Sequence, residues 1–294
     1  MVEIKKVKKG KQIYYYLFHN YREGKKVKGV YSYLGKEIPK DIDKLKKNLM
    51  NDFYKEKFLK KINNIKNNYL KEQKEIPKSL KEKELENFGI KFTYNSQRIE
   101  GSTLSLKETA DLIERGITPS SKPLRDVKEA EAHQKVFENM MEYKKDLNLR
   151  IIMDWNKKLL EQTKPDIAGK IRIHQVGIAR SKFTPPLAIE LELLLREFFQ
   201  WYNQIKNKIN PVELAGLVHL KFVTIHPFGD GNGRISRIMM NFILKKHKFP
   251  LLDIEYGNRN SYYNALERSQ VKGNEGIFLQ WFFKKYLKEY KKYL

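Results

Sequence analysis

The spacing of apolar residues along the chain predicts a mainly helical protein. Apolar residues recur at intervals of three and four over 211–225, and a second apolar run follows over 235–244, as on helices that bury one face. The lysine-rich residues 40–74 show similar spacings, which predict one long helix or two. Further helices are predicted over 79–101, 105–115, 124–143, 149–162, 187–205 and 276–294, and another begins at Ser261.

Two of the predicted helix starts carry a capping-box pattern. Ser79 is followed three positions later by Glu82, and Ser105 is followed in the same way by Glu108. In this pattern the serine hydroxyl and the acid each bond a backbone N–H of the first turn. Gly116 then supplies a stop for the second of these helices, because glycine readily adopts the left-handed conformation that ends a helix.

Two stretches interrupt the helical pattern with alternating β-branched and aromatic residues. Residues 12–34 predict a β-hairpin, in which Arg22–Lys25 forms the turn. A shorter hairpin is predicted over 175–186, with an ordinary connecting loop as the alternative. We therefore expect a small β-hairpin module over 1–38, a helical connector over 39–78 and a helical core over 79–294.

Composition narrows the class of protein and of site. The 294 residues include no cysteine, which excludes disulfides and thiolate metal sites. No apolar run approaches the ~20 residues that a membrane helix needs, and residues 1–6 lack the apolar segment of a signal peptide. We therefore expect no membrane association and a cytoplasmic location.

The charge balance is strongly basic and raises a question about partners. The formal net charge is +24, and residues 1–92 hold 25 Lys or Arg against 12 Asp or Glu, a difference of +13. Such an excess is typical of proteins that bind nucleic acid or other acidic partners. The alternative is a general bias of the genome, since lysine, asparagine and isoleucine are abundant together.

Most of the candidate chemistry lies in one twelve-residue stretch, His226–Arg237, which reads His-Pro-Phe-Gly-Asp-Gly-Asn-Gly-Arg-Ile-Ser-Arg. Gly231 and Gly233 allow a sharp turn and close approach of the backbone to a ligand. The N–H groups of such a turn and of the helix that follows bind anions. Arg234 and Arg237 are three residues apart, so both lie on one helix face and suit a polyphosphate.

Two further residues of this stretch could complete a reaction centre. Asp230 offers a hard oxygen ligand, which suits Mg²⁺ that bridges phosphate oxygens. His226 could take a proton from an incoming hydroxyl near neutral pH. Each feature alone could have a purely structural role, because turn glycines, solvated arginines and structural histidines are common. Their combination between two predicted helices favours a Mg²⁺-nucleotide site with its own base.

The stretch resembles the signature of the Fic family, His-Pro-Phe-x-Asp/Glu-Gly-Asn-Gly-Arg-x-x-Arg, and matches it at every fixed position. The resemblance spans roughly residues 79–282 and implies a Fic-type helical core that transfers AMP from ATP to a Ser, Thr or Tyr hydroxyl of a target protein. It makes His226 the base, Asp230 the Mg²⁺ ligand and Arg237 the ligand of the γ-phosphate. The residues implied to cradle the other phosphates are Gly231, Asn232, Gly233 and Arg234.

The glycine at position 233 also bears on the reaction. A branch of the family that phosphorylates its targets has lysine at this position, so Gly233 favours AMP transfer. The resemblance does not identify the target protein, and it leaves the oligomeric state open, with a homodimer as one alternative.

An inhibitory motif of the family is matched upstream of the signature. Ser96 to Gly101 read Ser-Gln-Arg-Ile-Glu-Gly, which is similar to Ser/Thr-x-x-x-Glu-Gly/Asn. The resemblance implies that Glu100 pairs with Arg237 and so occupies the guanidinium that the γ-phosphate needs. The alternative is that Glu100 merely precedes a glycine that ends the helix. Because some relatives use this glutamate to remove AMP from modified proteins, Glu100 could also serve the reverse reaction.

The remaining implied residues concern the target and the nucleoside. The predicted hairpin over 175–186 becomes the flap, whose strand edge holds the target segment by main-chain pairing and whose residues Val176, Gly177, Ile178 and Ala179 touch the nucleotide. The residues that match the family's adenosine pocket are Tyr262, Tyr263 and Gln270, although relatives often have asparagine where Gln270 stands. We interpret the other histidines as packing or surface residues, namely His133, His174 and His219.

Overall fold

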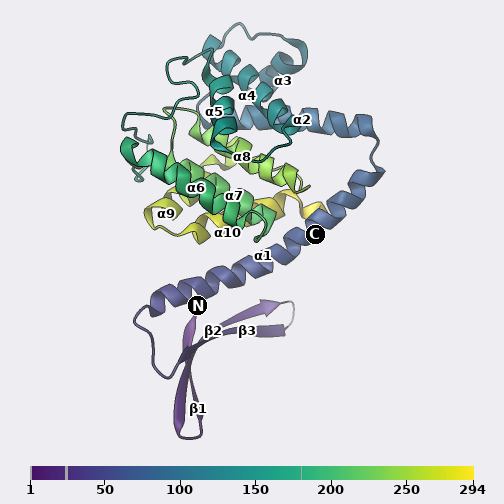
Figure 1. Cartoon of the computed structure of the whole chain (residues 1–294). Coiled ribbons are helices and arrows are strands. Elements are labelled where there is room, and N and C mark those ends of the chain that lie inside the picture. The colour runs from purple at the N-terminus through teal and green to yellow at the C-terminus, as the bar shows by residue number, and fades with distance from the viewer. Residues whose placement is uncertain (1, 24–25, 180) are drawn as a thin grey trace. The chain divides into compact units, whose positions relative to one another are not determined.

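The computed structural model describes residues 2–23, 26–179 and 181–294, and it is mainly helical, as the apolar spacing predicts (Figure 1). The chain divides into two compact units, Met1–Lys61 and Ile62–Leu294. The predicted connector is a single helix, α1 (Ile42–Glu75), which the unit boundary crosses. The boundaries expected at 38 and 78 remain predictions.

The first unit contains an antiparallel sheet in the order β1-β2-β3. Its strands are β1 (Glu3–Lys9), β2 (Gln12–Glu23) and β3 (Lys26–Gly35). The hairpin predicted over 12–34 is therefore confirmed, although turn residues Gly24 and Lys25 lie outside the described residues. Strand β1 was missed, because four of its seven residues are lysines and its alternation is weak.

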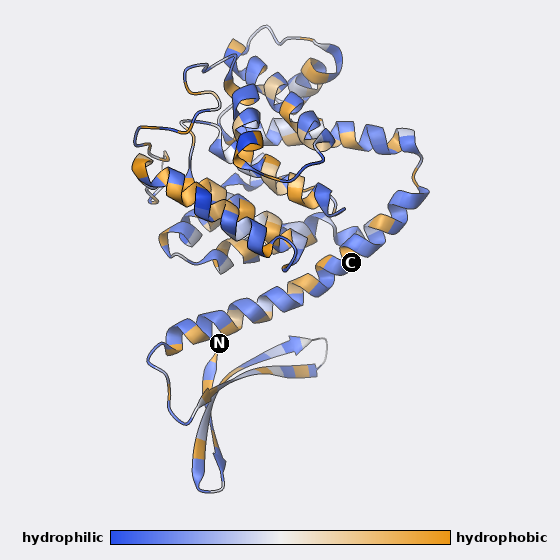
Figure 2. Cartoon of the chain, viewed as in Figure 1, coloured by the Kyte–Doolittle hydropathy of each residue, from blue (hydrophilic) through white to orange (hydrophobic). Residues whose placement is uncertain are grey.

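The second unit is built on two neighbouring helices, α7 (Pro211–Ile225) and α8 (Asn232–Lys246). Nearly every residue of both is buried, and they pack on each other (Figure 1). Figure 2 shows hydrophobic colours on these helices, whereas α1 is mostly hydrophilic. The surrounding elements are α2 (Lys78–Ile99), α3 (Leu106–Arg115), α4 (Leu124–Glu142), α5 (Leu149–Leu160), η1 (Ala188–Glu190), α6 (Leu191–Ile205), η2 (Tyr256–Asn258), α9 (Arg259–Val271), α10 (Glu275–Glu289) and η3 (Lys291–Tyr293).

The helix starts show which local signals decide a boundary. The capping box at Ser105 forms, with Glu108 N–H donating to the serine hydroxyl over 3.2 Å, and Gly116 ends the helix at φ 68°. The box predicted at Ser79 does not form. Helix α2 starts one residue earlier, at Lys78, directly after Pro77, which has no N–H to satisfy and whose fixed φ suits a helix entry. Helix α8 also starts earlier than predicted, at Asn232.

The hairpin predicted over 175–186 is wrong for the described residues, which form no strand there. Its described residues form a loop, and an isolated antiparallel bridge between Ile171 and Phe228 lies just before it in the chain. Arg172 holds the base of this loop together, because its guanidinium donates to the carbonyls of His174 (3.0 Å) and Pro186 (2.7 Å). An arginine that takes these carbonyls replaces the cross-strand bonds of a hairpin.

Within the described residues, none of the helices has both the length and the apolar stretch that crossing a membrane requires.

Candidate active site

The loop between α7 and α8 presents the signature residues in a fixed backbone conformation. His226 ends α7 in the left-handed region, at φ 52°, and Gly231 adopts φ 83° just before α8. The side chain of Asn232 closes the loop, because its amide accepts from Phe228 N–H (2.9 Å) and donates to Phe228 C=O (2.8 Å). Asn232 therefore acts on the loop itself, and its side chain does not reach outward.

Gly231 lies too close to α5 for any other residue. A Cβ at this position would lie 2.8 Å from Nδ2 of Asn156. That amide is fully buried and donates to the carbonyl of Asp230 (3.0 Å), while its oxygen accepts from Gly169 N–H (2.9 Å). Asn156 thus supports the loop from behind. Nothing in the sequence pattern singled it out beyond being a polar residue on an apolar helix face.

The ring of His226 is held in a defined tautomer. Its Nδ1 lies 3.2 Å from the carbonyl oxygen of Val223. A carbonyl can only accept, so Nδ1 carries the proton and Nε2 of the neutral ring is the acceptor. Burial, and then the charge of Arg172, lower the pKa of His226 below its usual 6.5 and outweigh the opposing effects of Glu100 and Asp230. The ring is therefore neutral near pH 7 and able to take a proton.

Asp230 lies at the start of α8 among cationic and polar groups. Burial acts to raise its pKa, but Arg234, Lys164 and the Gly231 N–H outweigh it, so the pKa lies below its usual 3.8. Its carboxylate accepts from Gly231 N–H (2.5 Å) and Arg234 Nη2 (3.0 Å), and it pairs with Lys164. Lys164 was not identified from the sequence, since it lies 66 residues from its partner.

The buried guanidinium of Arg234 is fixed by residues from two other helices. Its Nη1 donates to Gln97 of α2 (3.2 Å) and pairs with Glu129 of α4. Burial opposes its positive charge, but Asp230 and Glu129 raise its pKa above the usual value. Glu129 was not predicted either. The sequence pattern could have indicated it, because Glu129 is an acid on the same face of α4 as Val136 and Phe137, which are buried.

Arg237 is also buried and binds the C-terminal end of helix α2. Its Nε donates to the hydroxyl of Ser96 (3.0 Å) and its Nη2 to the Ser96 carbonyl (3.0 Å). The same Nη2 lies 2.7 Å from Oε1 of Glu100, the pair implied by the resemblance. Burial acts to lower its pKa, but Glu100 and Tyr262 outweigh it, so the pKa is raised.

Two buried histidines complete the surroundings of Arg237. His133 Nε2 lies 3.1 Å from the Ser96 hydroxyl, and His219 Nε2 lies 2.8 Å from the Tyr262 hydroxyl, which in turn is 3.4 Å from Arg237 Nη1. Burial, followed by the charge of Arg237, lowers the pKa of each histidine, so both are neutral. These two were expected to be packing or surface residues, and their burial fits packing. They also support the hydroxyls that bind Arg237.

Glu100 reaches this site from the end of α2. Gly101 adopts φ 100°, and Ser102 N–H bonds back to the Gln97 carbonyl (3.0 Å), so the glycine does end the helix. The carboxylate of Glu100 lies so close to Gly233 that a Cβ added there would collide with Oε1. Glu100 can therefore both precede the glycine that ends α2 and pair with Arg237. The end of the helix at Gly101 places the Glu100 carboxylate next to the first turn of α8.

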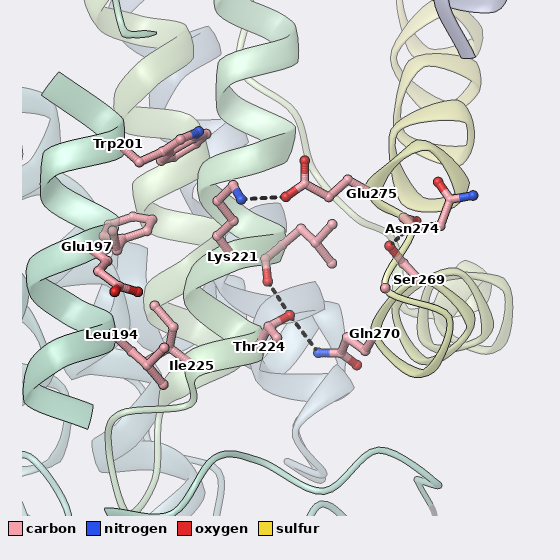
Figure 3. A pocket seen from close by; sticks show the side chains of 13 residues that line it. Leu194, Glu197, Trp201, Lys221, Thr224, Ile225, Ser269, Gln270, Asn274 and Glu275 are labelled. Carbon is pink, nitrogen blue, oxygen red and sulfur yellow. Dashed lines mark hydrogen bonds and ion pairs between the residues drawn. The ribbon is translucent and has the colours of Figure 1, made fainter. Parts of the chain in front are cut away.

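The three residues that the resemblance assigns to the adenosine pocket do not all line the cavity to which Gln270 contributes. Tyr263 donates to the Ile99 carbonyl (2.9 Å), whereas Tyr262 is buried beside Arg237. Gln270 donates to Thr224 (3.2 Å) and lines a cavity of about 370 Å³ between α6, α7 and α9, which neither tyrosine lines (Figure 3). Residues 176–179, which the resemblance assigns to a flap, lie in the loop that Lys182 N–H ties to Glu267 of α9 (2.9 Å).

Comparison with known proteins shows which family the signature region is similar to. Residues 146–244, which include the whole signature, match the Fic/DOC family model. Over these residues the chain is similar to the Fic/DOC family. It is 32% identical over 187 residues to Protein adenylyltransferase Fic of Drosophila yakuba, and 32% identical over 181 residues to that of Nematostella vectensis. These matches cover 62% and 60% of this chain but only 37% and 42% of the relatives, so the chain spans well under half of their length.

Solved structures agree with this assignment. A Fic domain containing signaling protein from Bacteroides thetaiotaomicron superimposes with a TM-score of 0.69 at 27% identity, over 78% of this chain and 94% of that one. Fic-1 (residues 134–508) from Caenorhabditis elegans has the same fold, with a TM-score of 0.73 at 22% identity, over 86% of this chain and 76% of that one. The Fic-type helical core predicted from the signature is confirmed.

Proposed function

We propose that this Fic protein transfers AMP from ATP to a hydroxyl group of a target protein. The observation that carries the proposal is the neutral ring of His226, whose Nδ1 is bound to Val223 and whose Nε2 is the acceptor, directly before the turn that starts α8. The names of the curated relatives, each a protein adenylyltransferase, support the same reaction. A base, an anion-binding helix start and two buried arginines are the parts that such a transfer needs.

The chemistry follows from these positions. Nε2 of His226 takes the proton of the target hydroxyl as its oxygen bonds to the α-phosphorus. The bond from that phosphorus to the bridging oxygen of the β-phosphate breaks, and pyrophosphate leaves with the electron pair. Among the described residues no side chain caps α8, so its first N–H groups are available to the phosphates. Arg234 and Arg237 stabilise the charge that develops on the leaving group.

The residues at the start of α8 fit Mg²⁺ that arrives with the nucleotide. The described residues contain no group of three acids or histidines that could hold a metal by themselves. Asp230 is ionised and offers one hard ligand, which suits a metal that takes its other ligands from phosphates and water. Bound there, Mg²⁺ would neutralise phosphate charge. Because the ammonium group of Lys164 pairs with the Asp230 carboxylate, Lys164 would have to release one carboxylate oxygen before Mg²⁺ could bind it.

Glu100 restrains this reaction in the proposed resting state. It holds Nη2 of Arg237 at 2.7 Å and lies against Gly233, at the place where the γ-phosphate would bind. A carboxylate there removes a donor from the phosphate and repels it as well. ATP would then bind with its phosphates in an unproductive arrangement, and target modification would be slow until Glu100 moves.

The target side of the proposal rests on the loop around 175–186. We propose that residues 176–179 touch the nucleotide, and that the backbone of this loop pairs with an extended segment of the target. Arg172 fixes the base of the loop to the catalytic turn, because its Nε donates to the His226 carbonyl (2.8 Å). The loop and the base would therefore keep a constant separation when a target segment binds.

The test uses ATP labelled at the α-phosphate, with Mg²⁺ and the full chain. We expect Glu100→Gly to raise the label on protein by roughly tenfold or more, since charge-assisted hydrogen bonds contribute about 1.5–3 kcal/mol. Adding His226→Ala to that variant should remove the label. Glu86→Gly is the matched control, because Glu86 is exposed on the same helix. Equal labelling of Glu100→Gly with and without His226→Ala would refute the assigned base.

Removal of AMP from a modified protein is the second candidate. Its support is the position of Glu100, whose side chain is 31% exposed and so remains open to water while one oxygen binds Arg237. A carboxylate so placed could orient a water for attack on the phosphodiester. Release of AMP from a pre-modified target by the wild type, and its loss in Glu100→Gly, would favour removal. Release of AMP by Glu100→Gly that equals or exceeds release by the wild type would favour transfer.

A further inference from the structure

The N-terminal sheet presents five aromatic rings on one face. Cross-strand partners lie on the same face of a sheet, and the register pairs Tyr16 with Tyr33 and Phe18 with Tyr31. Tyr14 lies two residues from Tyr16 and joins them, with its ring centroid 6.2 Å from that of Tyr33. We call this the aromatic face, made of Tyr14, Tyr16, Phe18, Tyr31 and Tyr33.

The opposite face of the sheet is the one that forms the core of this unit. Leu17 is 1% exposed, and His19 lies 5.2 Å from the ring of Phe53 on α1. Tyr21 packs on the same ring at 4.5 Å. Among the described residues of this unit, α1 therefore packs on the face opposite to the aromatic face. Tyr31 and Tyr33 are 54% and 57% exposed there, which is unusual for adjacent large rings.

The rings of the aromatic face are arranged in contact. The centroids of Phe18 and Tyr31 are 4.8 Å apart, and those of Tyr16 and Tyr33 are 5.2 Å apart. Lys5 of the edge strand extends over this group, 5.5 Å from the ring of Phe18 and 5.6 Å from that of Tyr31. The face thus combines flat apolar surfaces with a cation placed directly above them.

The unit that carries this face is strongly basic. Residues 1–61 hold 18 Lys or Arg and 7 Asp or Glu, a net charge of +11 out of +24 for the chain. A partner must therefore be polyanionic and must also offer flat groups to the rings. Unstacked bases on a phosphate backbone meet both conditions, and aromatic side chains with neighbouring lysines bind such strands with little regard to sequence.

We propose that the aromatic face binds single-stranded nucleic acid. Bases stack on the exposed rings of Tyr31 and Tyr33, and the lysines of the sheet contact the phosphates. A duplex fits less well, because its bases are already stacked and the rings, apart from their hydroxyls, offer few groups for base edges. This interaction is separate from the proposed AMP transfer, since none of its residues belongs to the second unit.

The test measures fluorescence anisotropy of labelled oligonucleotides of about 20 nucleotides with the full chain. Oligo-dT, oligo-U and a duplex of equal length are compared at about 50 and 200 mM salt. We expect both single strands to bind more tightly than the duplex, with affinity that falls as salt rises. Tyr31→Ala with Tyr33→Ala should weaken single-strand binding roughly tenfold or more, whereas Tyr31→Phe with Tyr33→Phe should keep it.

The matched control removes exposed apolar side chains elsewhere. Leu187→Ala with Ile189→Ala does so at residues that are 58% and 88% exposed in the second unit, and it should leave binding unchanged. Circular dichroism confirms that each variant is folded. Equal affinity of the wild type and the double alanine variant would overturn the proposal, as would tighter binding of the duplex or no binding at low salt. A wild-type dimer that Tyr31→Ala with Tyr33→Ala converts to monomers would instead make the face a contact between copies.

Discussion

The carboxylate of Glu100 lies 2.7 Å from Nη2 of Arg237, although the two residues are 137 positions apart in the chain. The same carboxylate touches Gly233, so one side chain from α2 contacts both the arginine and the backbone at the start of α8. Ser96, one helical turn earlier, takes the other side of the same guanidinium (3.0 Å). The arginine proposed to bind the γ-phosphate is thus bound by the end of α2 before any nucleotide arrives.

This contact predicts an energetic coupling between Glu100 and Gly233. Gly233→Ala should destabilise the wild type, because the new Cβ would collide with Glu100 Oε1. In the Glu100→Gly background the same change should be neutral or stabilising by up to about 1 kcal/mol, since alanine is the better helix former. Urea unfolding of the four proteins measures the coupling. Additive effects of the two changes would show that Glu100 does not occupy this space.

The ring of His226 predicts the pH dependence of the reaction. Burial lowers its pKa below 6.5, so AMP transfer by Glu100→Gly should rise with pH along an acid limb that is centred below that value. Glu100 itself acts to raise this pKa, so its removal should move the acid limb further down. The profile of kcat/KM against pH for Glu100→Gly checks this. An acid limb centred above 6.5 would contradict the assignment of a buried His226 as the base.

The ion pair of Glu129 with Arg234 predicts a loss of stability. Glu129→Gln leaves the buried guanidinium with one acid fewer, and breaking a buried ion pair costs about 3–5 kcal/mol of unfolding free energy. Asp230 remains on Arg234, which keeps the cost at the lower end. Chemical denaturation measures it, and Glu131→Gln on the same helix is the control. A change below about 0.5 kcal/mol, typical of surface sites, would show that Glu129 does not neutralise Arg234.

Asp253 predicts a second pH effect, on stability. Burial raises the pKa of Asp253 to about 7, while Asn95 donates to its Oδ2 over 2.6 Å. A carboxyl whose pKa is higher in the folded state stabilises the fold at low pH, and this contribution disappears as pH rises towards 7. Asp253→Asn should therefore be more stabilising at pH 8 than at pH 5, by about 2 kcal/mol. An equal effect at both pH values would mean that Asp253 is ionised throughout.

The elements of this protein were largely predictable because their signals are local. The apolar stripe of 211–225 gave α7 to the residue, and Ser105 with Gly116 gave both ends of α3. The predictions failed where a second residue competed for the same helix start or for the same backbone carbonyls. Pro77 set the start of α2 ahead of Ser79, and Arg172 bound the loop carbonyls that a hairpin would have paired.

The active-site residues divide in the same way. The twelve residues from His226 to Arg237 are contiguous, so their order in the sequence already fixes a turn followed by a helix that carries both arginines on one face. The partners of those arginines are not contiguous with them. Glu129 and Lys164 lie 105 and 66 residues from the groups they bind, and no local pattern predicted either contact.

By itself, the sequence determined the helical core, the turn between α7 and α8, and the candidate base and arginines in it, because short-range backbone geometry follows from residue type and spacing. The tertiary structure alone decided which groups hold Arg234, Arg237 and Asp230. Buried charges require partners within a few ångströms, and the packing of α2, α4 and α8 determines which distant side chains come that close. The same packing brings Glu100 to Arg237, where the proposed restraint acts.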